Sequence, residues 1–227
     1  MSNEFYHKGY CLTKRQEEVL APLLPAPKEK GRPSLNPLRV FSAILWILSS
    51  GSPWRDLPPH FGNWNNIYHK FRQWCAQNVF ENILKALVSD TDKYLLVQID
   101  STYCKVHRHA AGAHKILGNQ AIGVSRGGKN TKIHALVNEN FQLIGLLLSG
   151  GQVHDSTCAI ELLSKINLEG KTVLADKAFS SEHICDFIEL SKATVCIPDK
   201  DNSIIKHDFD NTLYKARNIV ERFFSYR

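Results

Sequence analysis

The sequence predicts an α/β protein in two parts, a small all-α domain followed by a mixed β-sheet flanked by helices. Three observations predict this class. Apolar residues recur at helical spacing through about the first ninety residues, whereas short β-rich runs alternate with helical segments after Lys93. Two of these runs end in an aspartate, Asp100 and Asp176. We expect an all-α domain over residues 1–92 and a sheet domain over residues 93–227, a length that suits a small and a larger core.

The first helix is expected after a capping signal. Thr13-Lys14-Arg15-Gln16 has the form of a capping box leading into residues 17–24, and Pro22 and Pro25 limit how far that helix runs. A segment rich in proline, lysine and glycine then runs to Pro33. It predicts a linker between the first helix and the second.

The second helix should begin at Asn36-Pro37, which supplies a cap and a proline at the first helical position. It should run to Ser50 and stop at Gly51. Four apolar residues form the stripe that this helix should bury, and they suggest no function beyond packing: Val40, Ile44, Leu45 and Leu48. This helix therefore predicts part of the first core.

A third helix should be capped by Asn63 or Asn66, and a fourth should cover residues 80–88. Three apolar residues share one face of the third helix: Ile67, Phe71 and Trp74. Basic and amide side chains lie nearer its other face: His69, Lys70, Arg72 and Gln73. Lys70 and Arg72 therefore suit a helix laid against DNA, as in a helix-turn-helix-like domain, although an ordinary solvated helix explains the pattern as well.

The sheet domain reads as eight elements in order. They are strands over 94–104, 131–137 and 142–148, a helix over 156–166 capped by Asp155, a strand over 172–176, a helix over 181–190, a strand over 194–198, and a final helix from about residue 212. This order is that of an RNase H-like α/β domain. In that fold the first and fourth strands lie side by side, and the last helix would carry Glu221 toward their ends.

Three carboxylates thus fall where an enzyme acting on phosphodiesters would need them: Asp100, Asp176 and Glu221. Hard cations such as Mg²⁺ prefer oxygen ligands, and two ions can stabilise the attacking and leaving oxygens of an in-line displacement. A single aspartate at a strand end would mean little, because such residues commonly start turns or cap helices. The interpretation therefore rests on all three together.

Charge is distributed unevenly in a chain whose formal net charge is +6. Residues 101–138 contain no Asp or Glu but six cations: Lys105, Arg108, Lys115, Arg126, Lys129 and Lys132. Beside a metal site such a stretch would attract phosphate, although a solvated basic loop is the alternative. The two glycines between Arg126 and Lys129 suit a phosphate cradle, or simply a turn into a strand.

Other classes of protein are disfavoured by what the sequence lacks. Its six cysteines show no C-x-x-C pair, which argues against a structural zinc site and for reduced thiols. The longest apolar run, residues 40–48, is far short of the ~20 residues that span a bilayer. We expect a soluble protein of the cytoplasm that is not associated with a membrane.

Ordered motifs along nearly the whole chain resemble a known family, the bacterial insertion-sequence transposases with a DDE catalytic triad and an N-terminal helical domain. The matching stretches are Gly31-Arg32-Pro33, Gly51-Ser52-Pro53-Trp54-Arg55-Asp56-Leu57-Pro58, Asp100-Ser101-Thr102, residues 125–135, Gly150-Gly151-Gln152-Val153-His154-Asp155, Ala175-Asp176-Lys177-Ala178-Phe179 and residues 214–224. Phe179 and Ser180 stand where the family usually has Tyr and often Asp. Neither position is an expected ligand.

The resemblance implies roles for particular residues. The family's catalytic, metal-binding triad falls on Asp100, Asp176 and Glu221, with Mg²⁺ as the cofactor and Mn²⁺ as a substitute. Its signature of a Tyr and an Arg ahead of the Glu falls on Tyr214 and Arg217, which could hold the phosphate beside the scissile bond. The structural alternative is a core aromatic and a surface ion-pair partner.

The resemblance also implies the reaction and the partners. Such an enzyme binds double-stranded DNA at the terminal inverted repeats, hydrolyses the phosphodiester at the element end, and then joins the released 3′ hydroxyl to target DNA. Synapsis of two ends implies a homodimer, although the sequence shows no oligomerisation motif. The resemblance also implies a bacterial protein associated with the nucleoid. The signature's last basic residue would stand at position 228, one residue beyond Arg227, so we expect a chain truncated at its C-terminus and impaired in catalysis.

Two other functions remain open at this point. A non-enzymatic remnant of a mobile element would still occupy the repeats and repress or poison the intact enzyme. A host nuclease of the same fold is disfavoured, because nothing in such an enzyme requires the Trp54-Arg55-Asp56-Leu57-Pro58 segment. Paired inverted repeats in the flanking DNA would identify a mobile element.

Overall fold

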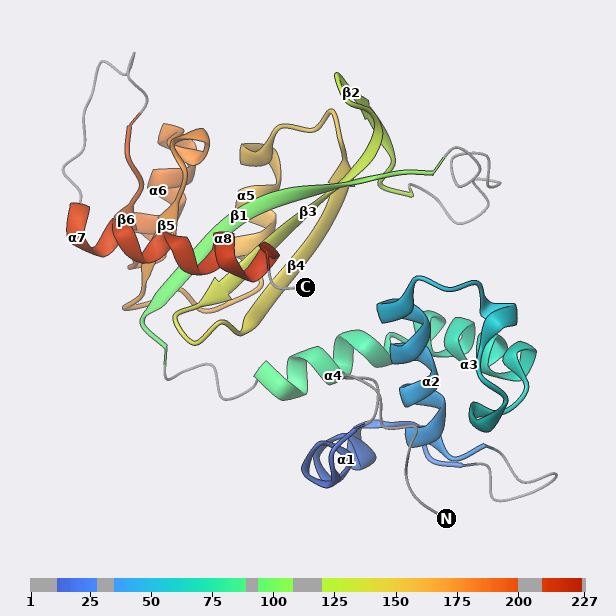
Figure 1. The fold of residues 1–227 in the computed structure, drawn as a ribbon. Helices are drawn as coiled ribbons and strands as arrows, with labels where there is room; N and C mark the ends of the chain where they lie inside the picture. The colour runs from blue at the N-terminus through green and yellow to red at the C-terminus, as the bar shows by residue number, and fades with distance from the viewer. Residues whose placement is uncertain (1–11, 28–34, 89–93, 108–119, 200–209, 226–227) are drawn as a thin grey trace. The chain divides into compact units, whose positions relative to one another are not determined.

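The computed structural model describes residues 12–27, 35–88, 94–107, 120–199 and 210–225. The chain divides into two compact units, Met1–Ser89 and Asp90–Arg227. Most of the expected linker over 25–33, and the expected domain boundary after residue 92, lie outside the described residues. The elements of both units are labelled in Figure 1.

The first unit begins with the capping box that the sequence predicts. Thr13 accepts a hydrogen bond from the backbone of Gln16, and the Gln16 side chain accepts one from Thr13, at the start of α1 (Lys14–Leu20). The α-helix is shorter than predicted because Pro22 lacks the N–H that the next turn requires, and the chain tightens into a 3-10 turn, η1 (Ala21–Leu23).

The second helix, α2 (Pro37–Ser50), has the predicted ends. The Asn36 side chain accepts a hydrogen bond from the backbone N–H of Leu38, and Gly51 ends the helix with a φ of +66°. A positive φ of this size is left-handed, which glycine adopts without the steric penalty of a side chain.

Two further helices complete this unit. After the 3-10 turns η2 (Trp54–Asp56) and η3 (Pro59–Phe61), α3 (Trp64–Ala76) is capped by Asn63, and α4 (Val79–Val88) follows. The core buries Val40, Ile44, Ile67 and Trp74 as predicted. The predicted stripe was wrong at Leu48, which is 62% exposed, because the buried face of α2 continues through Ala43 and Ile47 instead. Trp54 packs against Tyr68 and Phe71 at ring-centroid distances of 5.3 and 5.1 Å. The packing of this bundle thus depends on the Trp54 turn as well as on the helices.

The second unit contains a mixed sheet. Its strands within the described residues are β1 (Leu96–Lys105), β2 (Gly123–Ser125), β3 (Gly128–Asn138), β4 (Leu143–Gly150), β5 (Thr172–Ala175) and β6 (Thr194–Cys196). β3 pairs antiparallel with β1, β2 and β4, whereas β1, β5 and β6 are parallel neighbours. This arrangement confirms the RNase H-like fold class.

Helices cover both faces of the sheet (Figure 1). On one face lie α5 (Asp155–Leu163) and, beside it, α6 (Glu182–Leu190). On the other lies α8 (Asn218–Ser225), whose Val220 is fully buried against Ala135 and Val137 of β3. Because side chains alternate across a strand, Gln98, which bonds to α8, and Ser101, which bonds to α5, point to opposite faces of β1.

Three details differ from the sequence prediction. The hairpin of β2 with β3 was not predicted, because a three-residue strand beside glycines carries almost no periodicity. The final helix is not continuous. It consists of α7 (Asn211–Tyr214), a 3-10 turn η8 (Lys215–Arg217) and α8. A further 3-10 turn, η7 (Lys177–Phe179), follows β5, and Asp176 caps it.

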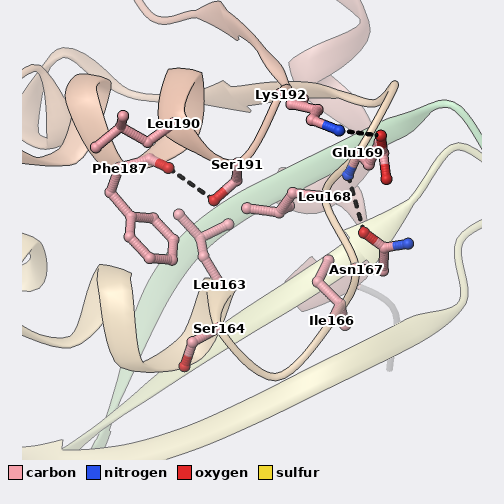
Figure 2. A pocket seen from close by; sticks show the side chains of 10 residues that line it. All are labelled: Leu163, Ser164, Ile166, Asn167, Leu168, Glu169, Phe187, Leu190, Ser191 and Lys192. Atoms are coloured by element: carbon pink, nitrogen blue, oxygen red, sulfur yellow. Dashed lines mark hydrogen bonds and ion pairs between the residues drawn. The ribbon is translucent and has the colours of Figure 1, made fainter.

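A cavity of about 370 Å³ lies between the C-terminal ends of α5 and α6 (Figure 2). Leu163 and Phe187 face it, and an ion pair between Lys192 and Glu169 closes one side at 2.8 Å. The cavity lies beside the segments that lead into β5 and β6, at the opposite end of these strands from Asp176. Within the described residues, no helix is long and apolar enough to cross a membrane.

Candidate catalytic site

The sheet places Asp100 and Asp176 on neighbouring parallel strands. Ile99 of β1 is in register with Ala175 of β5, so Asp100 and Asp176 follow at the same level of the two strands. Asp176 comes directly after the end of β5, whereas Asp100 lies inside β1, which continues to Lys105. Asp100 accepts a hydrogen bond from the backbone N–H of Ser101 at 2.8 Å. Asp176 accepts one from the backbone N–H of Lys177 at 2.6 Å. Both carboxylates are partly buried.

The third carboxylate, Glu221, comes from α8, which a buried amide ties to β1. The Oε1 atom of Gln98 accepts a hydrogen bond from the backbone N–H of Val220 at 3.1 Å, and both residues are fully buried. Gln98 belongs to the same face of β1 as Asp100, two residues on. The bond therefore fixes the turn that carries Glu221 over the face that carries Asp100.

The three carboxylates share one electrostatic environment. Burial raises the pKa of Asp100, and the negative charges of Glu221 and Asp176 raise it further, while the Ser101 N–H and the Arg217 guanidinium oppose the rise. The charges therefore act on one another through a partly buried space. An excess of negative charge of this kind is relieved when a cation binds.

Tyr214 and Arg217 lie in the same place, despite the 3-10 turn between them and α8. Arg217 forms an ion pair with Glu221, and its guanidinium carbon lies 5.7 Å from the centroid of the Tyr214 ring. Burial raises the pKa of the Tyr214 hydroxyl, with Asp176 and Glu221 adding to the rise and Arg217 opposing it. The structure thus places Tyr214, Arg217 and Glu221 close enough to Asp100 and Asp176 for their charges to interact.

The other cations expected to bind DNA lie elsewhere. Arg126 and Lys129 are exposed at the tip of the β2–β3 hairpin. Lys132 is not beside them, because its ammonium bonds to Asp155 at 2.9 Å and to the backbone carbonyl of Val153 at 2.8 Å. Lys70 and Arg72 are on α3 of the first unit, where Lys70 donates to Gln73. Arg108 and Lys115 of the basic stretch are outside the described residues.

Asp155 does not have the role that the sequence predicts. The residue that caps α5 is His154, whose side chain accepts a hydrogen bond from the backbone of Ser156, and Asp155 is the first residue inside the helix. Its Oδ1 atom instead accepts hydrogen bonds from Ser101 and Lys132. The prediction was wrong because only the tertiary fold brings Ser101 and Lys132 to this carboxylate.

Sequence reasoning also overlooked Gln98 and Ser101. Gln98 could have been noticed as the one polar residue inside the apolar run from Leu95 to Ile99. A fully buried amide requires hydrogen-bond partners, so its presence predicts a contact across the sheet. No comparable signal marks Ser101, which is an ordinary residue after the aspartate that ends the apolar run.

The charge on Asp100 should reduce the stability of the metal-free protein. Because its pKa is raised by folding, Asp100 favours the folded state while protonated, below about pH 3.9, and that contribution is lost as pH rises through its folded pKa. Asp100→Asn removes the charge and should raise Tm at pH 7 in EDTA. The gain in Tm should vanish in acid, where the Asp100 carboxyl is protonated. Thermal melts of both proteins from pH 3 to 8 measure this difference. A variant whose Tm never exceeds that of the wild type would contradict the prediction.

Comparisons with known proteins show what this chain is similar to. A family model described as "Putative transposase of IS4/5 family" matches residues 12–84, and one described as "Transposase DDE domain" matches residues 91–226. The chain is 34% identical over 93 residues to the uncharacterized protein y4sN of Sinorhizobium fredii, covering 41% of this chain and 74% of that protein. It is 28% identical over 112 residues to the uncharacterized 16.2 kDa protein of insertion element IS402 of Burkholderia cepacia, covering 44% and 74%.

Two solved structures are also similar, the Mos1 transposase paired-end complex with the left transposon end and a pre-cleavage Mos1 transpososome. Each is 12% identical, with coverage of 88% of this chain and 75% of that chain and a TM-score of 0.32. The family is shown by the sequence match instead. Because the model "Transposase DDE domain" matches residues 91–226, more than half of the chain, this protein belongs to the family of DDE transposases.

Proposed function

We propose that this transposase binds the inverted-repeat ends of a mobile element and catalyses metal-dependent DNA cleavage and strand transfer at the site formed by Asp100, Asp176 and Glu221. The observation that carries the proposal is the register of β1 and β5. It sets two aspartates side by side, and α8 adds a glutamate whose charge raises the pKa of Asp100. Carboxylates that raise the pKa of a neighbouring carboxylate in a partly buried space are stabilised by a bound cation, which supports this function.

The residues present fit a pair of hard divalent cations, with Mg²⁺ as the natural choice. All three side chains offer oxygen atoms, which such ions prefer. When bound, the ions supply Lewis-acid stabilisation of the attacking and leaving oxygens of an in-line displacement. Among the residues that the structure describes, no three His, Cys, Asp or Glu side chains are gathered closely enough to hold a metal. Glu221 is instead paired with Arg217, so its carboxylate has to exchange that partner for the ion.

When Glu221 exchanges Arg217 for the ion, Arg217 becomes available to bind DNA. Once released from Glu221, its guanidinium can donate two parallel hydrogen bonds to a DNA phosphate, a geometry that lysine cannot reproduce. The Tyr214 ring lies beside it and can orient the guanidinium, and the Tyr214 hydroxyl can donate to the same phosphate. These two residues would hold the scissile phosphodiester against the three carboxylates.

The basic tip of the β2–β3 hairpin is proposed to follow the DNA backbone. Lys129 is on the same face of β3 as Ala135, which is opposite Asp100, whereas Lys132 points to the other face. Arg126 and Lys129 are therefore better placed than Lys132 to contact phosphate near the site. The helical unit, with Lys70 and Arg72 on α3, is proposed to recognise the repeats.

This placement predicts how salt affects DNA binding. Arg126→Ala combined with Lys129→Ala should lower affinity for repeat and random DNA alike, and should flatten the log–log dependence on salt by about one unit per lost phosphate contact. Lys192→Ala is the control, because that exposed lysine is paired with Glu169. Gel shifts across a salt series give the slopes. Equal slopes for the double variant and the control would contradict a role for the hairpin.

The function itself is tested with DNA that carries the inverted repeats flanking the gene. Purified full-length chain should cut at the repeat ends in Mg²⁺ or Mn²⁺ and should leave the DNA intact in EDTA. Specific binding without cleavage in either metal would support the alternative of a repeat-binding remnant. Loss of both specific binding and cleavage, in folded protein, would contradict the proposal.

A further inference from the structure

A polar cluster lies under the catalytic site, on the face of the sheet opposite Asp100. Its members come from β1, β3, β4 and α5: Ser101, Lys132, His134, Ser149 and Asp155. His134 is fully buried and Ser149 is 9% exposed. Buried polar side chains are costly unless they are bonded, so a cluster in this position requires a physical explanation.

Asp155 is the centre of this cluster. Its Oδ1 atom accepts hydrogen bonds from the Ser101 hydroxyl at 2.8 Å and from the Lys132 ammonium at 2.9 Å, and it lies 3.9 Å from Nδ1 of His134. Burial raises the pKa of Asp155, but the bonds from Lys132 and Ser101 outweigh burial and hold the pKa below its usual range. Asp155 is thus an ionised carboxylate that joins the start of α5 to two strands.

Ser101 connects this carboxylate to the catalytic site. Its hydroxyl donates to Asp155 on one face of the sheet, while its backbone N–H donates to Oδ1 of Asp100, whose side chain belongs to the other face. A single residue therefore holds the Asp100 carboxylate with its main chain and is itself held by Asp155 through its side chain. Displacement of Ser101 would move the hydrogen-bond donor that orients Asp100.

We propose that Asp155 is a positioning residue, which acts through Ser101 to fix the orientation of the Asp100 carboxylate for metal binding. The inference rests on the proposed function, since it assumes that Asp100 is a metal ligand. Partners that orient a ligand in this way typically change metal affinity about 10- to 100-fold when they are removed. Asp155 itself does not contact the metal in this account, because it lies on the opposite face of β1.

The far end of the same cluster supplies a matched control. Ser149 bonds to Nε2 of His134 at 2.7 Å and is separated from Ser101 by that imidazole and by Asp155. Burial lowers the pKa of His134 more than the nearby Asp155 raises it, so the imidazole is neutral at pH 7. Ser149→Ala should therefore remove the hydrogen bond to His134 without moving the Ser101 N–H that donates to Asp100.

The experiment measures Mn²⁺ affinity of the full chain by electron paramagnetic resonance of the free ion, with Tm recorded for each variant. We expect Ser101→Ala and Asp155→Ala each to weaken Mn²⁺ binding about 10- to 100-fold. The double variant should bind Mn²⁺ no more weakly than either single variant, because both substitutions remove the same hydrogen bond between Ser101 and Asp155. Ser101→Thr, which keeps the hydroxyl, should bind Mn²⁺ as the wild type does, and so should Ser149→Ala.

The outcomes separate this inference from the proposed function. If Asp100→Asn binds Mn²⁺ as well as the wild type, the proposed function fails and the inference fails with it. If Asp100→Asn loses binding but Ser101→Ala does not, only the inference is overturned. It is also overturned if Ser149→Ala weakens binding equally, or if the single effects add. Should Asp155→Ala not fold, the contrast between Ser101→Ala and Ser101→Thr decides.

Discussion

Asp100→Asn, Asp176→Asn and Glu221→Gln should each reduce DNA cleavage at the repeat ends by about a thousandfold or more, while repeat binding stays within a few-fold of wild type. Metal ions contribute several kcal/mol to transition-state stabilisation, and each 1.36 kcal/mol is a factor of ten in rate. Removal of one charged ligand from a set of three should forfeit most of that contribution. Cleavage and gel-shift assays on the same preparations give both quantities.

Matched carboxylates on α6 control for the loss of charge alone. Asp186→Asn and Glu182→Gln remove the same groups from exposed positions of the sheet unit, and both should cleave at the wild-type rate. If a triad variant cuts as fast as these controls, the residue it replaces is not a metal ligand. Because Asp100→Asn is also expected to be more stable at neutral pH, its loss of cleavage could not be attributed to unfolding.

Val220→Asp should abolish cleavage although it changes no proposed ligand. Val220 is fully buried against Ala135 and Val137, so an aspartate there would place an unpaired charge in an apolar contact at a cost of about 3–5 kcal/mol. The least costly response is release of α8 from the sheet, since a helix of only eight residues can open locally. Glu221, Arg217 and the bond to Gln98 would leave the site together.

Hydrogen exchange of residues 218–225, with cleavage measured in parallel, tests this expectation. Exchange in α8 should rise to nearly unprotected rates in Val220→Asp, and cleavage should fall as far as in Glu221→Gln. Asn218→Asp adds the same charge to an exposed position of the same helix and should change neither. Protected α8 amides together with lost cleavage would contradict the account of how Glu221 is placed.

Local signals in the sequence were sufficient to predict elements whose ends are encoded by neighbouring residues. Asn36-Pro37 and Gly51 define α2, and the capping box at Thr13 defines the start of α1. The run that ends at Asp100 predicts a strand, and its parallel pairing with the run that ends at Asp176 follows from the order of elements. These features depend on spacing and capping chemistry, which a single sequence displays.

Features that depend on partners distant in the sequence were missed or misread. Asp155 and Lys132 are separated by 23 positions, and only the fold makes them an ion pair on the face opposite Asp100. The break in the final helix at residues 215–217 is also unmarked, because neither Gly nor Pro interrupts that stretch. For Arg217 the sequence reading did include an ion pair as the structural alternative, but it did not name Glu221 as the partner, although a spacing of four residues permits that pair.

The central claim, that Asp100, Asp176 and Glu221 together hold the divalent ions, is tested most directly by iron-mediated cleavage of the protein chain. Fe²⁺ bound in place of Mg²⁺, with ascorbate and peroxide, generates hydroxyl radicals that cut the backbone close to the ion. The account predicts cuts near residues 100, 176 and 221, suppressed by excess Mg²⁺ and absent in Asp100→Asn. Cuts that cluster elsewhere, or cuts near these residues that survive in Asp100→Asn, would contradict it.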